Sequence, residues 1–188
     1  MAKKDRLFDY QQIAEQAAKF KPKLIISGGT AYARVINHQL LGKIAKNVGA
    51  YYLADIAHEA GLVAAGAHPA PFAWADIVTF TTHKTLRGPR GAVILSKKID
   101  KFDKNVNLAR KIDRSVFPGL QGGPHLHTIA GIAVALQQTQ TAAFKKYAKQ
   151  VVKNAKLFAK IFIDAGYDVV GGGTDKHLVL LDLRQNKV

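Results

Sequence analysis

Short apolar runs alternate with longer amphipathic stretches along most of this chain. Such alternation predicts an α/β domain, in which helices separate and cover buried strands. The apolar runs predict strands at residues 24–26, 51–54, 77–80, 92–95, 167–170 and 178–183. Apolar positions at helical spacing predict helices at residues 37–48, 129–140 and 144–165. We find no internal repeat and no low-complexity segment.

Three polar residues come shortly after predicted strands. Thr30 ends the turn that follows strand 24–26, Asp55 follows strand 51–54, and Lys84 follows strand 77–80. In open α/β sheets, ligands bind at the carboxyl ends of the strands. We therefore expect these three residues to share one rim of the sheet.

Asp55 is followed three residues later by His58. A carboxylate at a buried strand end is costly unless a cation or a hydrogen-bond donor meets it. One such partner is a pyridinium nitrogen, whose proton makes the ring an electron sink. Two alternatives stay open, namely a metal site that lacks a clear third ligand and a simple cap for the next helix.

Lys84 stands between a strand end and a turn that contains Gly88 and Pro89. This place suits Schiff-base chemistry, because burial and the nearby cations Arg87, Arg90 and His83 would favour the neutral amine. The alternative is a lysine that only packs its stem against the turn. Arg90 could bind an anion or brace the loop through backbone carbonyls.

The loop 117–124 is rich in glycine and proline and precedes a predicted helix. Gly122 and Gly123 could offer backbone N–H groups to a phosphate, or form an ordinary turn. His125 and His127 are interpreted as residues of the helix start, because no carboxylate lies within helical reach to complete a metal site. We expect no metal centre.

The formal net charge is +15, with 28 Lys and Arg against 13 Asp and Glu. The lysines are spread over several segments, and those of residues 144–160 alternate with an apolar helix face. This favours a solvated basic surface, with polyanion binding as the alternative.

The absence of cysteine excludes disulfides and thiolate metal sites and fits a cytoplasmic location. We expect no signal peptide and no membrane span, since the N-terminus is charged and no apolar run approaches about 20 residues.

Together, these motifs resemble one enzyme family. The sequence Thr-Thr-His-Lys-Thr-Leu-Arg-Gly-Pro-Arg-Gly at 81–91 resembles the cofactor-lysine motif of serine hydroxymethyltransferase. Asp-Ile-Ala-His at 55–58, followed by Ala-Gly-Leu-Val-Ala at 60–64, resembles the pyridine-binding strand of the same family. Segments 28–32, 117–124 and 172–178 resemble it as well. The resemblance runs in order from about residue 7 to residue 184.

The resemblance implies an aminotransferase-like, fold type I large domain with a mainly parallel sheet flanked by helices, truncated at both ends. Residues 1–165 would form part of this domain that binds pyridoxal phosphate, and residues 166–188 would begin a small C-terminal domain. The implied reaction interconverts serine plus tetrahydrofolate and glycine plus 5,10-methylenetetrahydrofolate. Two other functions stay open: a threonine aldolase-like enzyme of the same fold, and a non-catalytic basic fragment that binds polyanions.

The resemblance also implies roles for individual residues. Lys84 would carry pyridoxal 5'-phosphate covalently, Asp55 would pair with the pyridine nitrogen, and His58 and Thr30 would lie against the phenolic oxygen. Thr30 stands where the family usually has serine, which keeps the hydroxyl. His83 would lie near the phosphate, and Thr81 and Arg90 near the reacting amino acid. Gly122 and Gly123 would reach the phosphate of the neighbouring subunit in a homodimer.

The resemblance further implies that several family parts fall outside this sequence. They are the N-terminal arm, the catalytic glutamate, a phosphate-binding Gly-Ser loop, the histidine that stacks on the ring, much of the folate pocket and the arginine that binds the substrate carboxylate. We therefore expect the 188-residue chain alone to have little or no hydroxymethyl transfer activity.

Overall fold

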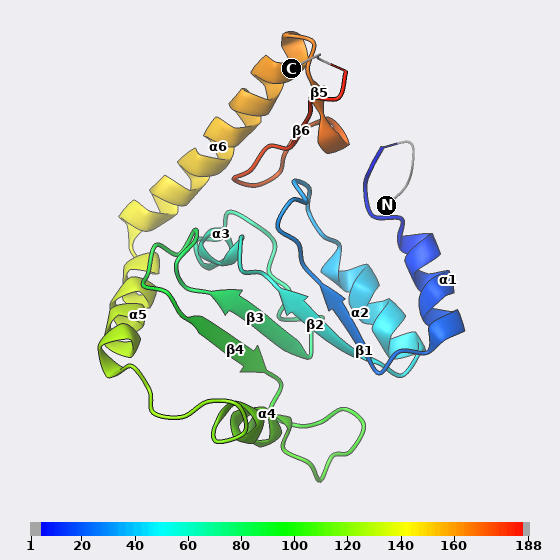
Figure 1. The fold of residues 1–188 in the computed structure, drawn as a ribbon, viewed down its shortest axis with the longest axis vertical. Coiled ribbons are helices and arrows are strands. Elements are labelled where there is room, and N and C mark those ends of the chain that lie inside the picture. Colours follow the sequence, from blue (N-terminus) through cyan, green and yellow to red (C-terminus); the bar gives the residue numbers. More distant parts are fainter. Residues whose placement is uncertain (1–4, 186–188) are drawn as a thin grey trace.

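Four of the predicted strands form one sheet in the computed structural model, which describes residues 5–185 (Figure 1). The strands are β1 (Leu24–Ser27), β2 (Tyr51–Asp55), β3 (Ile77–Thr81) and β4 (Ala92–Ser96), and they lie side by side in that order. The pairs β1–β2 and β2–β3 are parallel, whereas β4 runs antiparallel to β3. The sheet is therefore mainly parallel, as predicted.

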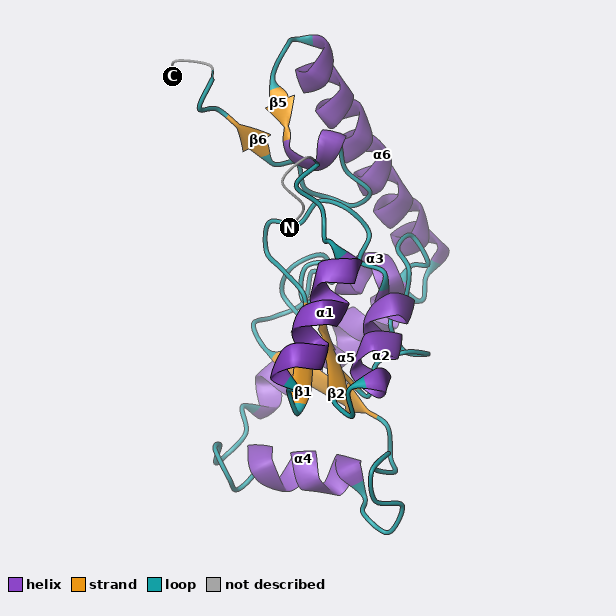
Figure 2. Cartoon of the chain, turned by 90° about the vertical axis from the view of Figure 1, so that its right-hand side faces the viewer, coloured by secondary structure: helices purple, strands orange, loops and turns teal. Residues whose placement is uncertain are grey.

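The main core forms where helices α1 (Tyr10–Phe20) and α2 (His38–Asn47) pack beside β1 and β2 (Figure 2). Asn37 starts α2 by accepting a hydrogen bond from the backbone N–H of Leu40 at 3.0 Å. The helix then buries Leu41 and Ile44 in the same cluster as Tyr52 of β2. Burying a side chain such as Leu41 stabilises the fold by roughly 1.5–3 kcal/mol.

Helix α5 (Leu126–Thr139) approaches the turn between β3 and β4 closely. A Cβ atom added to Gly88 would lie 3.0 Å from the Cβ of Ala135, and one added to Gly91 would lie 2.8 Å from Cδ1 of Ile132. These two glycines therefore let the turn lie directly against α5.

Helix α6 (Ala142–Asp164) runs from the end of α5 to the C-terminal part of the chain (Figure 1). Its residues Phe144 and Ala148 form a second core with Leu62 and Ala65, which lie in and directly after α3 (Ala60–Ala64). No helix within residues 5–185 is long and apolar enough to cross a membrane.

The C-terminal residues form a separate two-stranded sheet. Strands β5 (Asp168–Val169) and β6 (Leu181–Asp182) pair antiparallel, with a short 3-10 helix (Val170–Gly172) after β5. The guanidinium of Arg6 bonds Asp168 at 2.9 Å and Asp182 at 3.2 Å, which ties the N-terminal segment to this sheet. The proposed domain boundary at residues 165/166 stays a prediction.

The structure differs from the predicted elements at several places. The strands predicted at 167–170 and 178–183 shorten to two residues each, because Gly171 and Gly172 adopt positive φ angles of 74° and 66° and end the first strand. Helices α1, α3 and α4 (Leu108–Val116) were not predicted. Residues Tyr10, Ile13, Ala14 and Ala17 of α1 stand at helical spacing and pack in or against the main core, so a signal for this helix was present in the sequence.

Candidate active site

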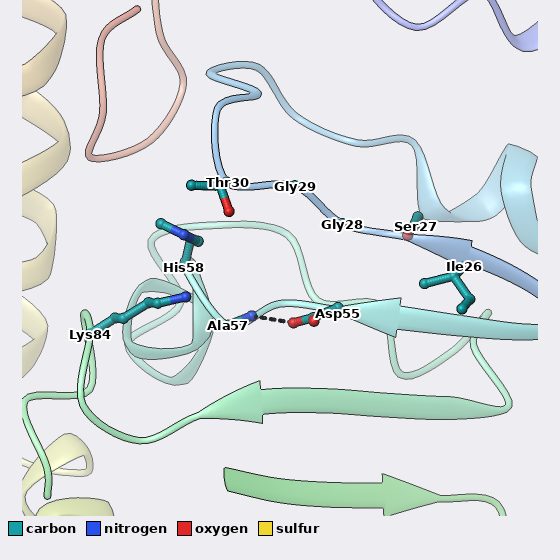
Figure 3. Close-up of a pocket in the computed structure, with 9 residues that line it drawn as sticks. All are labelled: Ile26, Ser27, Gly28, Gly29, Thr30, Asp55, Ala57, His58 and Lys84. Carbon is teal, nitrogen blue, oxygen red and sulfur yellow. Dashed lines mark hydrogen bonds between the residues drawn. The ribbon is translucent and has the colours of Figure 1, made fainter. Parts of the chain in front are cut away.

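A pocket of about 370 Å³ opens at the carboxyl ends of β1, β2 and β3 (Figure 3). These three strands are parallel, so their carboxyl ends meet at one edge of the sheet. The pocket is lined by Ile26, Ser27, Gly28, Gly29, Thr30, Asp55, Ala57, His58 and Lys84. The structure thus brings together four of the predicted site residues: Thr30, Asp55, His58 and Lys84.

Asp55 ends β2 with its carboxylate exposed in the pocket. Its Oδ1 accepts a hydrogen bond from the backbone N–H of Ala57 at 2.9 Å, and it has no other hydrogen-bond partner among residues 5–185. The turn after β1 passes very close, since a Cβ atom on Gly28 would lie 2.9 Å from the backbone oxygen of Asp55. The carboxylate therefore keeps acceptor capacity for a donor that enters the pocket.

His58 is half-buried, and its pKa is lowered from the ordinary value, first by burial and then by the positive charge of Lys84. The imidazole is therefore neutral at pH 7. Its ring lies nearly parallel to that of His177, with centroids 5.7 Å apart and an interplanar angle of 16°. His58 can thus donate one hydrogen bond and accept another in the pocket.

The Lys84 loop is held by several short hydrogen bonds. The Thr82 hydroxyl donates to the backbone oxygen of Pro89 at 2.6 Å, and the N–H of Gly88 donates to the oxygen of Thr82 at 2.7 Å. The Thr85 hydroxyl donates to the oxygen of His58 at 2.7 Å and accepts from the N–H of Gly61 at 3.0 Å. The Lys84 side chain extends from this loop toward His58 (Figure 3).

The other predicted site residues do not line this pocket. The Thr81 hydroxyl lies 3.5 Å from the backbone oxygen of Ala57, at the limit of a hydrogen bond. His83 Nε2 lies 3.4 Å from Nη1 of the exposed Arg90. Nδ1 of His83 is buried and has no hydrogen-bond partner within the part of the chain that the structure describes.

Gly122 and Gly123 also lie outside the pocket, in an exposed loop where an added Cβ would meet no atom within 4 Å. Their predicted contact with a neighbouring subunit stays a prediction. Among residues 5–185, no group of three or more His, Cys, Asp and Glu side chains is placed to hold a metal ion.

Two polar clusters beside the pocket were not predicted from the sequence. Glu59, next to His58, forms a buried ion pair with Lys176. Behind the pocket, the Tyr52 hydroxyl lies 2.7 Å from Oγ of Ser27 and 2.6 Å from Nδ1 of His38, and burial raises the pKa of Tyr52 to about 12. A glutamate at the start of the apolar stretch 60–65 could have signalled a buried cation, but not which one.

Comparison with known proteins gives the family. The family model for serine hydroxymethyltransferase matches residues 1–188, which is the whole chain. The chain belongs to the serine hydroxymethyltransferase family. It is 54% identical over 179 residues to a serine hydroxymethyltransferase of Onion yellows phytoplasma (strain OY-M), covering 95% of this chain and 41% of that relative. It is 51% identical over 177 residues to the Dichelobacter nodosus (strain VCS1703A) enzyme of the same name, covering 94% of this chain and 41% of that relative.

The serine hydroxymethyltransferase family consists of transferases with the fold of type I pyridoxal-phosphate enzymes, so the predicted fold class is confirmed. The chain spans about two fifths of the length of the curated relatives it matches.

Proposed function

We propose that this serine hydroxymethyltransferase family member acts in the interconversion of serine plus tetrahydrofolate and glycine plus 5,10-methylenetetrahydrofolate, with pyridoxal 5'-phosphate on Lys84. One observation carries the proposal. Lys84, Asp55, His58 and Thr30 line a single pocket at the carboxyl edge of the sheet.

The residues of this pocket fit pyridoxal phosphate. The Asp55 carboxylate has acceptor capacity for a ring N–H donor, and the Lys84 amine extends into the same space. His83 does not line the pocket, but its buried Nδ1 has no hydrogen-bond partner within residues 5–185, and we propose that it donates to the cofactor phosphate. When bound, the cofactor would supply an electron sink for negative charge at the α-carbon of an amino acid.

The side chains of this chain would then have distinct tasks. Asp55 would hold a proton on the ring nitrogen, because its negative charge favours the protonated form. His58, which is neutral at pH 7, and the Thr30 hydroxyl would orient the ring by hydrogen bonds. Lys84 would attach the cofactor through Nζ, and the hydrogen-bonded loop around Thr82 and Thr85 would hold that atom in place.

The finer parts of the proposal concern substrates and assembly. Thr81 and Arg90 would contact the reacting amino acid, and tetrahydrofolate would be the co-substrate. Gly122 and Gly123 would reach the cofactor phosphate of a neighbouring subunit in a homodimer, which their exposure allows. We also propose a cytoplasmic location, which the absence of cysteine suits.

A binding experiment tests the assignment of Lys84 and needs no turnover. The 188-residue chain is titrated with pyridoxal phosphate, followed by absorbance, then reduced with borohydride and mapped by peptide mass spectrometry. We expect one modified peptide, containing Lys84, and loss of that product in Lys84→Ala. Lys98→Ala, at an exposed lysine just after β4, should bind as the parent chain does. A folded chain that forms no adduct, or forms it equally at surface lysines, contradicts the proposal.

The reaction itself is tested separately by an assay of serine cleavage with and without tetrahydrofolate. Serine cleavage should require tetrahydrofolate. Cleavage of threonine that proceeds equally well without folate would favour the aldolase alternative instead.

A further inference from the structure

Glu59 and Lys176 form an ion pair that is almost entirely shielded from solvent. The Lys176 ammonium donates to Oε1 of Glu59, and the side chains are 0% and 6% exposed, respectively. Glu59 directly precedes α3, yet its carboxylate makes no hydrogen bond to the N-terminus of that helix. The carboxylate turns instead toward a residue 117 positions later in the chain.

The segment that carries Lys176 is also tied to the loop after β1. The N–H of Asp175 donates to the backbone oxygen of Ala33 at 2.9 Å. The Asp175 carboxylate accepts from Nη1 of Arg34 at 3.0 Å and from the N–H of Val35 at 3.1 Å. Residues 174–176 are therefore held on one side by the segment 33–35 and on the other by Glu59.

The next residue, His177, places its ring almost parallel to that of His58, which lines the pocket. Nδ1 of His177 is buried and has no hydrogen-bond partner within residues 5–185. Within this part of the chain, the orientation of the His177 ring is therefore not fixed by a hydrogen bond to Nδ1. Its place depends on packing and on the backbone of the preceding residue, Lys176.

We propose that Lys176 is a positioning residue, whose buried ion pair with Glu59 sets His177 against His58 and thereby holds the His58 imidazole in the pocket. The buried ammonium and carboxylate have a strong preference for each other, because water is not available to replace either partner. Glu59 adjoins His58 and Lys176 adjoins His177, so this contact links the two backbones that carry the rings directly. The inference rests on the proposed function only in treating the pocket as the cofactor site.

The charges around the two rings agree with this arrangement. The charges of Lys84, Glu59, Lys176 and Asp55 act on the pKa of His58, and those of His58, Glu59, Lys176 and His68 act on the pKa of His177. Burial is the largest cause that lowers the pKa of each imidazole, to about 4 for His177. At pH 7 both rings are therefore neutral and can lie parallel without charge repulsion.

The test is a nuclear magnetic resonance experiment on the cofactor-free 188-residue chain. The observable is the nuclear Overhauser effect between the ring protons of His58 and His177, assigned with His58→Gln and His177→Gln. We expect this effect in the parent chain and its loss in Lys176→Met, together with changed ring chemical shifts. Lys160→Met is the matched control, because Lys160 forms an exposed ion pair with Asp164, and it should leave both signals unchanged.

Lys176→Met leaves the Glu59 carboxylate buried without its partner and could unfold the chain for that reason alone. The double variant Glu59→Leu/Lys176→Met removes both charges of the pair, and we expect it to fold but still to lose the effect between the two rings. Persistence of the effect with unchanged shifts in the double variant overturns the proposal, since packing alone would then set His177. Failure of both variants to fold also overturns it, because the pair would then serve the whole fold. No step uses pyridoxal phosphate, so a failure to bind cofactor at Lys84 is a separate result.

Discussion

Helix α3 packs against the backbone of the Lys84 loop, and Gly61 is the residue that permits this contact. A Cβ atom at position 61 would lie 2.7 Å from the backbone nitrogen of Leu86 and still closer to the carbonyl group of Thr85. The obstructing atoms are backbone, so no rotation of a side chain can relieve the overlap. We therefore predict that Gly61→Ala displaces the loop that carries Lys84.

The size of the effect follows from the overlap. The loop must withdraw by roughly 1 Å to reach an ordinary van der Waals separation. Overpacking of this kind costs about 1–3 kcal/mol, and stretching the hydrogen bond from Gly61 N–H to Thr85 adds about 1 kcal/mol. The higher helix propensity of alanine offsets roughly 0.5–1 kcal/mol of this. We expect a net loss of about 1–3 kcal/mol in the free energy of unfolding, and the displacement of the loop should weaken attachment at Lys84.

Two measurements check this prediction. Urea unfolding followed by circular dichroism gives the change in the free energy of unfolding, and titration with pyridoxal phosphate gives the change in affinity. Ala64→Ser is the matched control, because Ala64 lies exposed on the same helix and should change neither quantity appreciably. Unfolding and titration curves of Gly61→Ala that coincide with those of the parent chain would refute the reasoning.

Three further predictions follow from other contacts. Thr85→Val leaves a backbone N–H and a backbone C=O near the start of α3 without a partner, so it should cost about 1–3 kcal/mol in urea unfolding, whereas Thr85→Ser should retain most of the stability. Burial lowers the pKa of His38 from 6.5 to about 4. The unfolded chain therefore takes up this proton first as the pH falls, and stability should drop by about 3 kcal/mol as the pH is lowered from 6.5 to below 4 and then level off; a slope that is unchanged in His38→Gln would contradict this. The Arg87 guanidinium lies 5.1 Å and 4.4 Å from the ring centroids of Phe144 and Tyr147. Arg87→Ala should lower the unfolding midpoint by an amount equivalent to about 0.5–1 kcal/mol, and an unchanged midpoint would show that this contact contributes nothing.

The order of residues along the chain was enough to predict the fold class and much of the pocket. The strands β1 to β4 were predicted because their apolar runs are local features of the chain. Thr30, Asp55 and Lys84 follow three of these strands, and the parallel pairing that is typical of α/β proteins brings strand ends to one edge. The prediction of the strands and the placing of the polar residues after them both need only the order of residues. The common rim of the sheet could therefore be predicted before any contact was known.

Contacts between distant parts of the chain were decided by the tertiary structure alone. The pairing of Glu59 with Lys176 and the close approach of Gly61 to Thr85 depend on how α3, the Lys84 loop and the C-terminal segment pack together. A sequence pattern shows that a buried charge needs a partner, but several lysines could serve. Only packing determines which atoms meet, because burial and distance are properties of the whole fold.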